Sequence, residues 1–200
     1  MDLEGKRVLV VGSGKSGVAA AELLKKKGIE FVLFDGNKEL NVDALAEKNP
    51  VFAGAKIILG ELSEQDMAAL DLVVLSPGVP TDLPMVNTLR DRGIPIWGEI
   101  ELAYHFAKGR IIAITGTNGK TTTTTLVGEI MSNYYPDVKV VGNIGIPYTS
   151  VAADTTENTV TVAEISSFQL ETTHDFAPEV TAILNITPDH LNRHHTMECY

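Results

Sequence analysis

The residues whose types and spacing most clearly indicate chemistry lie at Ile111–Thr122, where an apolar run leads through a glycine-containing turn to a Lys-Thr pair. Glycines in such a turn let backbone N–H groups point at phosphate oxygens, Lys120 adds a mobile positive charge, and Thr121 offers a hydroxyl to Mg²⁺ at a helix N-terminus. The spacing departs from G-x-x-x-x-G-K-[ST], because Ile114 or Thr115 stands where the first glycine would be, which disfavours a generic P-loop GTPase. The alternative is a glycine-rich connector with an incidental lysine. The pattern predicts a phosphate-binding loop formed by Gly116, Thr117, Asn118, Gly119, Lys120, Thr121 and Thr122.

A second glycine-rich turn, Gly12–Gly17, follows the apolar run Val8–Val11. It matches G-x-G-x-x-G, and the acid Asp35 follows after the next predicted strand, as in a dinucleotide-binding fold. Because any nucleotide diphosphate can bind at such a helix N-terminus, the motif predicts a nucleotide without saying which, and NAD stays open. The alternative is that the glycines serve only close packing of strand and helix. Ser76-Pro77-Gly78, at the end of another predicted strand, either lines the same site or forms an ordinary turn.

Polar side chains also follow two later predicted strands. Glu164 ends an apolar run, which is the position of a carboxylate that binds Mg²⁺ beside a phosphate loop. His190 lies in the polar segment Asn185–Arg193 and is predicted to be a metal or substrate ligand, the alternative being a histidine without such a role. Three nearby polar residues are interpreted as solvated surface groups: Glu171, His194 and His195.

Short apolar runs alternate with helix-period segments and would position these residues. In the first half, strands are predicted at 7–11, 31–34, 56–59, 72–75 and 94–97, and helices at 15–27, 42–48, 64–70 and 83–92. After a helix at 99–107, further strands are predicted at 110–114, 138–141, 159–164 and 180–186. Strands joined by helices form parallel sheets, whose strands are apolar on both faces. The predicted fold class is therefore α/β.

The two sets of strands predict two domains. We expect a Rossmann-like parallel-sheet domain at residues 1–98 and a P-loop-type α/β ATPase domain at residues 99–200, with the boundary near Gly98. The second domain is expected to be truncated. The reason is that a helix predicted to open at Pro188 runs toward Tyr200 with no further strand or cap.

Composition and charge disfavour several classes of function. The chain has 44% hydrophobic and 21% charged residues, which is typical of a globular protein. Its net charge of -10 argues against DNA and RNA as partners, because nucleic-acid binding relies on clustered Lys and Arg. Cys199 is the sole cysteine, so no intrachain disulfide can form. Without a signal peptide or an apolar run long enough to span a membrane, we expect a cytoplasmic protein without membrane insertion.

Taken in order along the chain, the motifs resemble those of the Mur ligase family over essentially the whole sequence. The motifs that carry the resemblance are Gly12–Gly17, Ser76–Gly78, Gly116–Thr122, Gly142–Gly145, Glu164–Glu171 and Asn185–Arg193. The resemblance is greatest to the members that add D-glutamate, and the alternative within the family is another Mur-type amide ligase. It implies an N-terminal domain that binds the UDP part of the substrate and a central domain that binds ATP. The implied contacts to the UDP substrate are Ser13, Gly14, Lys15, Ser16, Asp35, Gly78, Asn143, Ser166, Gln169 and His190.

The resemblance also implies a reaction, the joining of D-glutamate to UDP-N-acetylmuramoyl-L-alanine in peptidoglycan precursor synthesis. The L-alanyl carboxylate would attack the γ-phosphate of ATP, and the amine of D-glutamate would then open the acyl phosphate to an amide. The implied catalytic groups are Lys120, Glu164 and His190, with Mg²⁺ bound by Thr121, Glu164 and His190. The family also uses a carbamylated lysine beyond His190, whereas the last lysine here is Lys139. We therefore expect little ligase activity from the chain as given, and a monomer at full length.

Two other classes of function stay open on the sequence alone. An NAD-dependent oxidoreductase would use the first glycine-rich turn but would leave the Lys120 loop without a role. A noncatalytic module would bind a nucleotide without turning it over. The uracil contacts are not predicted, because Gly36 and Asn37 stand where some family members have a side chain able to grip the uridine.

Overall fold

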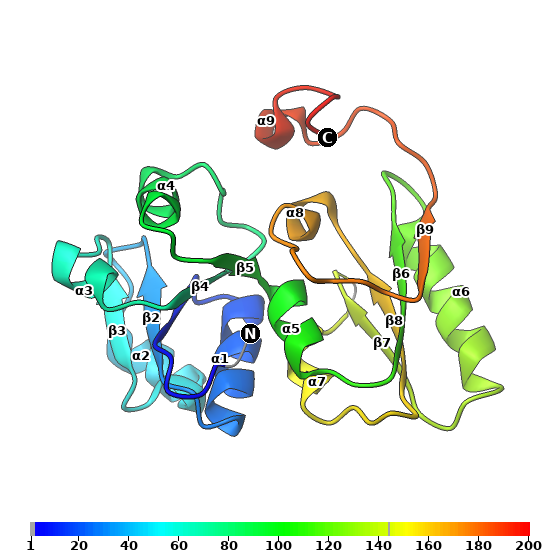
Figure 1. Ribbon diagram of the computed structural model, residues 1–200, viewed down its shortest axis with the longest axis horizontal. Helices are drawn as coiled ribbons and strands as arrows, with labels where there is room; N and C mark the ends of the chain where they lie inside the picture. The colour runs from blue at the N-terminus through cyan, green and yellow to red at the C-terminus, as the bar shows by residue number, and fades with distance from the viewer. Residues whose placement is uncertain (1–2, 144) are drawn as a thin grey trace.

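The computed structural model describes residues 3–143 and 145–200, which form two parallel sheets side by side (Figure 1). The first sheet has the order β3-β2-β1-β4-β5, with all neighbouring strands parallel. Its strands are β1 (Val8–Val11), β2 (Phe31–Asp35), β3 (Lys56–Leu59), β4 (Leu72–Leu75) and β5 (Ile96–Gly98). The central strands β1 and β4 are buried along their whole length, as their continuous apolar sequences predict.

Helices cover both faces of the first sheet. They are α1 (Lys15–Lys26), α2 (Val42–Lys48), the short 3₁₀ helix η1 (Pro50–Phe52), α3 (Glu64–Ala68) and α4 (Pro84–Asp91). Because side chains alternate along a strand, Val8 and Val10 face α1, whereas Leu9 and Val11 pack in the cluster that includes residues of α3 and α4. We call this sheet with its helices the first lobe.

The second sheet has the order β7-β8-β6-β9 and is also parallel. Its strands are β6 (Arg110–Thr115), β7 (Val138–Gly142), β8 (Val160–Glu164) and β9 (Val180–Ile183). The helices of this half are α5 (Glu99–Phe106), α6 (Lys120–Ser132), α7 (Thr149–Ala152), α8 (Ser167–Leu170) and α9 (Leu191–His194). We call this half the second lobe. The α/β class with parallel sheets, predicted from the sequence, is confirmed.

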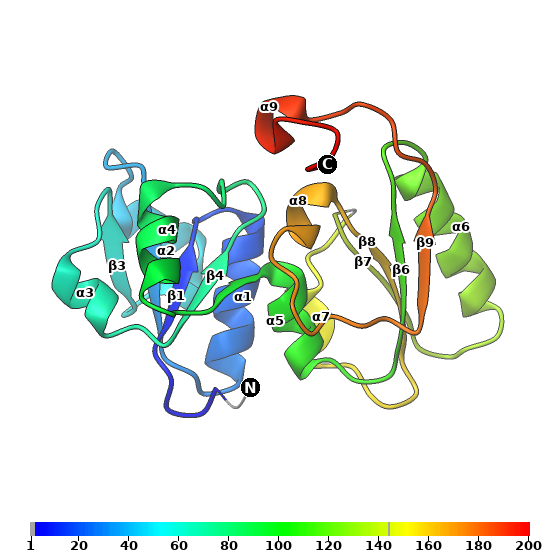
Figure 2. The ribbon, with the colours of Figure 1, turned by 45° about the horizontal axis from the view of Figure 1, so that its top comes forward.

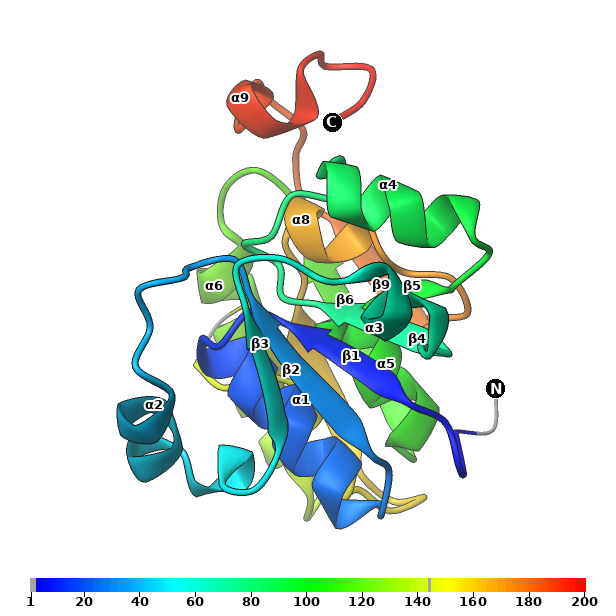
Figure 3. The same cartoon turned by 90° about the vertical axis from the view of Figure 1, so that its left-hand side faces the viewer.

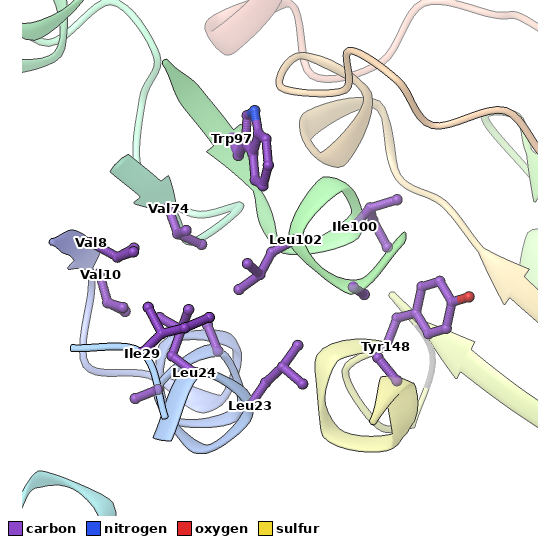
Figure 4. Close-up of a cluster of buried hydrophobic side chains, with 14 of the residues drawn as sticks. Val8, Val10, Leu23, Leu24, Ile29, Val74, Trp97, Ile100, Leu102 and Tyr148 are labelled. Atoms are coloured by element: carbon purple, nitrogen blue, oxygen red, sulfur yellow. The ribbon is translucent and has the colours of Figure 1, made fainter. Parts of the chain in front are cut away.

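The two lobes share one hydrophobic core. Leu23 and Leu24 of α1, Ile100 and Leu102 of α5, and Tyr148 at the start of α7 lie in one buried cluster (Figure 4). The same cluster contains residues of β1 and β4 in the first sheet and of β6, β7 and β8 in the second. The layer formed by α1, α5 and α7 therefore lies between the two sheets and is buried against both.

Two buried glutamates fix helix α5 to the rest of the second lobe. Glu99 accepts hydrogen bonds from the backbone N–H (2.7 Å) and hydroxyl (3.0 Å) of Thr149. Glu101 accepts backbone N–H bonds from three consecutive residues, His174, Asp175 and Phe176. Burial raises the pKa of Glu99, although the hydrogen bonds from Thr149 and Gln169 act in the opposite direction. Because α5 begins directly after β5, these bonds tie the end of the first sheet to the second lobe.

Some predicted boundaries were wrong near the end of the chain. Strand β9 ends at Ile183 and not at residue 186, and the predicted terminal helix is limited to the single turn Leu191–His194. In the first sheet, the predicted strand at 94–97 is instead Ile96–Gly98.

Within residues 3–143 and 145–200, no helix is both long enough and apolar enough to cross a membrane.

The loops that follow the strands of both sheets open toward one side of the molecule. The strand arrows of β2, β6 and β9 point toward the side where α8 and α9 lie (Figure 1). From the side of the first lobe, α4 and α9 are seen at the same end (Figure 3). Since ligands of open parallel sheets bind beyond the carboxyl ends of the strands, this side carries the candidate sites.

Candidate nucleotide sites

The loop between β6 and α6 has the backbone of a phosphate-binding turn. Gly119, directly before the helix, has φ 83°, a conformation that favours glycine. The Nζ atom of Lys120 donates to the carbonyl oxygens of Gly116 (2.7 Å) and Thr117 (3.0 Å), so the ammonium group lies over its own loop. A phosphate at this helix N-terminus would find backbone N–H groups and a positive charge together.

A residue from the end of the second sheet holds this loop in place. The side-chain oxygen of Asn185 accepts the backbone N–H of Asn118 (2.9 Å), and its Nδ2 donates to the Asn118 carbonyl (2.9 Å). The motif Asn185–Arg193 did not predict this role for Asn185. The usable signal was its position just beyond the end of a strand that neighbours β6, which leads into the loop.

Glu164 ends β8 and is buried, with an exposure of 1%. Its Oε2 accepts the hydroxyl of Thr121 (2.8 Å), and its Oε1 accepts the Nδ2 of Asn143 (2.7 Å). The structure thus brings together three of the predicted site residues. A hydroxyl and a carboxylate at the N-terminus of α6 are oxygen ligands of the kind that Mg²⁺ prefers, so these residues fit a Mg²⁺–nucleotide.

A pocket of about 210 Å³ extends from Lys120 and Asn143 to His190. His190 is the residue before α9 and has φ 50°, a left-handed conformation that is unusual for a residue other than glycine. Its ring lies 4.9 Å from the ring of Phe168, and its Nε2 lies 3.6 Å from Asp189. The residues that line the pocket are Thr115, Gly116, Lys120, Asn143, Ser166, Ser167, Phe168, Leu170, Ile183, Asn185, Ile186, Asp189, His190 and Tyr200.

Among these lining residues, the sequence analysis did not identify Phe168 or Tyr200 as site residues. Tyr200 forms a hydrogen bond of 2.8 Å with the hydroxyl of Thr117. Both aromatic side chains reach the pocket from segments that are remote in sequence from the phosphate loop, so local spacing gave no signal for them.

The second glycine-rich turn forms a separate site in the first lobe. A Cβ atom on Gly17 would lie 1.8 Å from the carbonyl oxygen of Gly12, so the close approach of α1 to the turn requires glycine here. Ser13 donates to Asp35 through its hydroxyl (2.6 Å) and its backbone N–H (3.0 Å). Burial acts to raise the pKa of Asp35, but the hydrogen bonds from Ser13 and Asn37 outweigh it and hold that pKa below its ordinary value.

The remaining predicted groups of this site lie around the same turn. Gly14, Lys15 and Ser16 form the junction with α1, and Lys15 is exposed. The Oγ of Ser76 is buried without a hydrogen-bond partner among the described residues and lies close to Gly12. Gly78, two residues further on, is exposed. A ligand that carries phosphates could reach the start of α1 at Gly14, Lys15 and Ser16, where the helix N-terminus and the Lys15 charge favour an anion.

A larger groove and a cluster of charged residues lie outside these sites. The groove, of about 750 Å³, lies at the amino ends of β1, β2 and β3, and none of the described residues that line it is a predicted site residue. The cluster consists of Glu101, His105 and Asp175, whose potential ligand atoms lie within 4.8 Å of one another. The Glu101 oxygens already accept three backbone N–H bonds, which is a structural role.

Comparison with known protein families decides the assignment. Residues 6–98 match the family described as "Mur ligase MurD-like, N-terminal domain", and residues 114–200 match the family described as "Mur ligase middle domain". The chain belongs to the Mur ligase family. The resemblance inferred from the motifs is confirmed.

Curated Mur ligases align along the whole chain. A protein of Lachnoclostridium phytofermentans named UDP-N-acetylmuramoylalanine--D-glutamate ligase is 61% identical over 200 residues, which are 100% of this chain and 44% of that protein. A protein of the same name from Clostridioides difficile is 49% identical over 201 residues, again 100% of this chain and 44% of the relative. The chain thus spans less than half the length of the curated Mur ligases that it matches.

Solved structures of Mur ligases share the fold. UDP-N-acetylmuramate-alanine ligase from Thermotoga maritima aligns with a TM-score of 0.55 at 23% identity, over 98% of this chain and 45% of that structure. A UDP-N-acetylmuramate:L-alanyl-gamma-D-glutamyl-meso-diaminopimelate ligase from Neisseria meningitides aligns with a TM-score of 0.55 at 16% identity, over 94% of this chain and 63% of that structure. At these identities the similarity establishes the fold alone.

One residue that the Mur ligase resemblance assigned to the UDP substrate, Gln169, lies behind the pocket surface. Gln169 is buried, with an exposure of 4%, and its Oε1 accepts from the backbone N–H (2.9 Å) and hydroxyl (3.0 Å) of Ser166. Its Nε2 faces Glu99 at 3.4 Å. Gln169 therefore supports Ser166, which itself lines the pocket. Within the motif Gly142–Gly145, Ile144 lies outside the described residues.

Two interpretations of surface residues were wrong. The side chain of Glu171 is only 18% exposed and forms an ion pair with Arg193 (2.7 Å), so it is not a solvated helix charge. His194 is buried, its Nε2 lies 2.9 Å from the hydroxyl of Ser167, and its Nδ1 lies 3.4 Å from Glu171. His195 is exposed, as predicted. The contacts of Glu171 and His194 come from segments distant in sequence, which periodicity does not predict.

Proposed function

We propose that the chain carries the UDP-substrate site and the ATP site of a ligase that adds D-glutamate to UDP-N-acetylmuramoyl-L-alanine. The observation that carries the proposal is the contact of Thr121 and Asn143 with the buried Glu164 beside the Lys120 loop. The named activity of the curated relatives, which are up to 61% identical, supports this choice of substrates. The whole protein would act in peptidoglycan precursor synthesis.

In this proposal, residues 99–200 form a P-loop-type ATPase unit and residues 1–98 form the UDP-substrate unit. The order of the two family matches, 6–98 followed by 114–200, supports a boundary near Gly98. The extended core around α5 argues that this boundary is a rigid joint and not a flexible linker. ATP phosphates would bind the residues from Gly116 to Thr122, and Mg²⁺ would bind Thr121 and Glu164.

His190 is proposed to contact the substrate and to join Thr121 and Glu164 as a ligand of Mg²⁺. His190 lines the same pocket as Lys120 and Asn143, and Asn143 donates to Glu164. Asn143 and His190 would then reach the muramoyl end of the substrate, while Ser13, Asp35 and Gly78 bind its nucleotide end.

The chemistry supplied by Mg²⁺–ATP is transfer of its γ-phosphate to the L-alanyl carboxylate, with release of ADP. The amine of D-glutamate would then form the amide bond and release phosphate. The two reacting groups of the first step are both anionic, so their approach is opposed electrostatically. The ammonium of Lys120 and the N-terminus of α6 would offset this repulsion by lying next to the phosphates before reaction begins.

Calorimetry on the 200-residue chain tests the assignment of the first site. We expect UDP-N-acetylmuramoyl-L-alanine to bind with one-to-one stoichiometry, UDP to bind more weakly at the same site, and NADH to give no competing heat. Because the NAD-dependent oxidoreductase alternative shares the glycine-rich turn, tighter binding of NADH than of UDP would reject our proposal.

A further inference from the structure

Arg193 connects the two lobes on the side of the molecule where both candidate sites lie. Its Nη2 donates to the backbone carbonyl of Val79 in the first lobe (3.1 Å) and to Oε2 of Glu171 in the second (2.7 Å). Its Nε donates to the other carboxylate oxygen of Glu171 (3.2 Å), so the ion pair has two hydrogen bonds. Figure 2 shows α9, which contains Arg193, next to α8 and above the layer between the two lobes.

Glu171 contacts the first lobe as well. The hydroxyl of Thr81 donates to Oε2 of Glu171 at 3.1 Å, two residues after the Val79 carbonyl that Arg193 binds. The side chains of Arg193 and Glu171 are only 12% and 18% exposed. Two hydrogen bonds in a largely covered environment distinguish this pair from ordinary surface ion pairs, which contribute little.

On each lobe, the residues of this contact adjoin a candidate site. On the first lobe, Val79 follows Gly78 of the UDP-substrate site. On the second lobe, the backbone N–H of Arg193 donates to the carbonyl of His190 (2.8 Å). The Arg193 guanidinium also lies 4.9 Å from the ring centroid of Phe168, whose ring is in turn 4.9 Å from that of His190. A displacement of Arg193 would therefore move the loop at Gly78 and the segment at His190 relative to each other.

We infer that Arg193 and Glu171 form an interlobe clasp that couples occupation of the UDP-substrate site to occupation of the ATP site. The clasp consists of these two side chains, the Val79 carbonyl and the Thr81 hydroxyl. Arg193 and Glu171 are positioning residues, since they act on the ligands through Gly78 and His190. The inference rests on the proposed function, because it requires one ligand on each lobe.

The test is a coupling measurement on the 200-residue chain. The dissociation constant of UDP-N-acetylmuramoyl-L-alanine is measured without and with saturating Mg²⁺ and a nonhydrolysable ATP analogue. We expect the two constants of the unmodified chain to differ about 5-fold or more, within the usual range of coupling between sites. In Arg193→Ala and in Glu171→Gln we expect the ratio to fall to within about twofold of unity, since either change breaks the same contact. In the double variant, the ratio of the two constants should lie no closer to unity than in either single variant.

Arg92→Ala is the matched control, because Arg92 forms an ion pair with Glu64 inside the first lobe, away from the clasp. It should retain the coupling of the unmodified chain. Arg193→Lys, which restores the charge but not the fork of donors, should recover part of the coupling if the clasp acts by position. A purely structural role would lower the melting temperature of Arg193→Ala and leave the ratio unchanged.

Each outcome separates the inference from the proposed function. Retained coupling in Arg193→Ala, or no coupling in the unmodified chain while each ligand still binds alone, would overturn the clasp and leave the proposed function standing. Failure of the unmodified, folded chain to bind either ligand would overturn the proposed function and the clasp with it.

Discussion

Lys120 lies folded onto its own loop, with its ammonium group bound to the Gly116 and Thr117 carbonyl oxygens. Phosphate oxygens would compete for the same donor, and a charged pair makes the stronger hydrogen bond. Binding of a triphosphate should therefore draw Lys120 away from these carbonyls. The structure has the lysine, the helix N-terminus and the Thr121–Glu164 pair already adjacent, so the loop needs little rearrangement beyond this exchange.

Replacement of Lys120 by alanine should weaken binding of a Mg²⁺–ATP analogue with little effect on the fold. A hydrogen bond to a charged group contributes about 1.5–3 kcal/mol, which corresponds to a loss of affinity of about 10- to 150-fold. We expect the melting temperature to change by less than about 2 °C, because the Lys120 ammonium contacts only its own loop. Calorimetry gives the affinity, with Lys108→Ala, an exposed lysine paired with Glu157, as the control. Equal affinities in the two variants would contradict this role.

Asp35 should show the effect of its hydrogen bonds in an acid titration. Burial opposes ionisation, but the bonds from Ser13 and Asn37 prevail and lower the pKa of Asp35. A carboxyl whose pKa is lower in the folded chain stabilises the fold above its unfolded pKa, about 3.9, and this contribution is lost as the pH falls through the folded pKa. Ser13→Ala should raise the pKa of Asp35 and reduce this acid-side loss of stability. Carbon NMR of the Asp35 carboxyl group measures this pKa in the unmodified chain and in Ser13→Ala. An identical titration in both chains would reject the explanation.

At the scale of elements, helix α5 is the joint of the molecule. It begins directly after β5 of the first sheet, yet its buried acids bond to residues of the second lobe, Glu99 to Thr149 and Glu101 to the backbone at 174–176. Glu99 also faces Gln169, which supports Ser166 in the pocket. The joint between the lobes is therefore in hydrogen-bonded contact with the residues behind the pocket that Ser166 lines.

Glu99→Gln should change the pH dependence of stability. Burial raises the pKa of Glu99 in the folded chain, so the folded state holds this proton more tightly than the unfolded state. Stability from this group is fully present below its unfolded pKa, about 4.3, and is lost as the pH rises through the folded pKa. Relative to Glu99→Gln, the unmodified chain should therefore lose free energy of unfolding as the pH rises from about 4. Denaturant unfolding at a series of pH values measures the difference, and a constant difference between the two chains would refute it.

The sequence was most informative where local pattern and burial agree. Strands such as β1 and β4 are apolar throughout because both of their faces are covered, and the predicted ranges matched closely. Strand β9 was predicted too long, since Ile183 at its end (66% exposed) and Ile186 beyond it (62% exposed) are apolar and resemble residues of a buried strand in sequence. The short helices α7 and α8 have a single turn each, too little for a periodic signal.

The site was predictable where a motif is contiguous. Gly116–Thr122 run from the loop after β6 into the first turn of α6, and strand ends brought Glu164 and Asn143 next to Thr121, as parallel-sheet topology requires. Glu171 and His194 were misassigned because their partners, Arg193 and Ser167, lie 22 and 27 residues away in sequence. Such pairs depend on how α8 and α9 pack, and no local propensity encodes that.

At the scale of the whole molecule, the two sheets are held together by one core. The cluster around α1, α5 and α7 includes residues of both sheets, so each lobe buries part of its apolar surface against the other. We therefore expect the two lobes to unfold together in one cooperative transition.

Leu102→Ala tests the shared core, because Leu102 of α5 is fully buried in the cluster between the sheets. Loss of its side chain should cost about 2–5 kcal/mol. Unfolding is followed by the fluorescence of Trp97, which reports on the first sheet, and by far-ultraviolet circular dichroism, which reports on both sheets. The unfolding midpoints from the two signals should shift by the same amount. Leu126→Ala, on the exposed face of α6, should have an effect of less than about 1 kcal/mol. Two separate transitions in the unmodified chain would argue against the common core.

The central claim is that the Lys120 loop binds the triphosphate of ATP. The most direct measurement is a crystal structure of the chain with a nonhydrolysable ATP analogue and Mg²⁺. We expect phosphate density at the N-terminus of α6, Lys120 Nζ moved from the Gly116 and Thr117 carbonyls to a phosphate oxygen, and Mg²⁺ bound by Thr121 and Glu164. A well-ordered structure at saturating analogue in which Lys120 keeps its present contacts and the analogue lies elsewhere would contradict the claim.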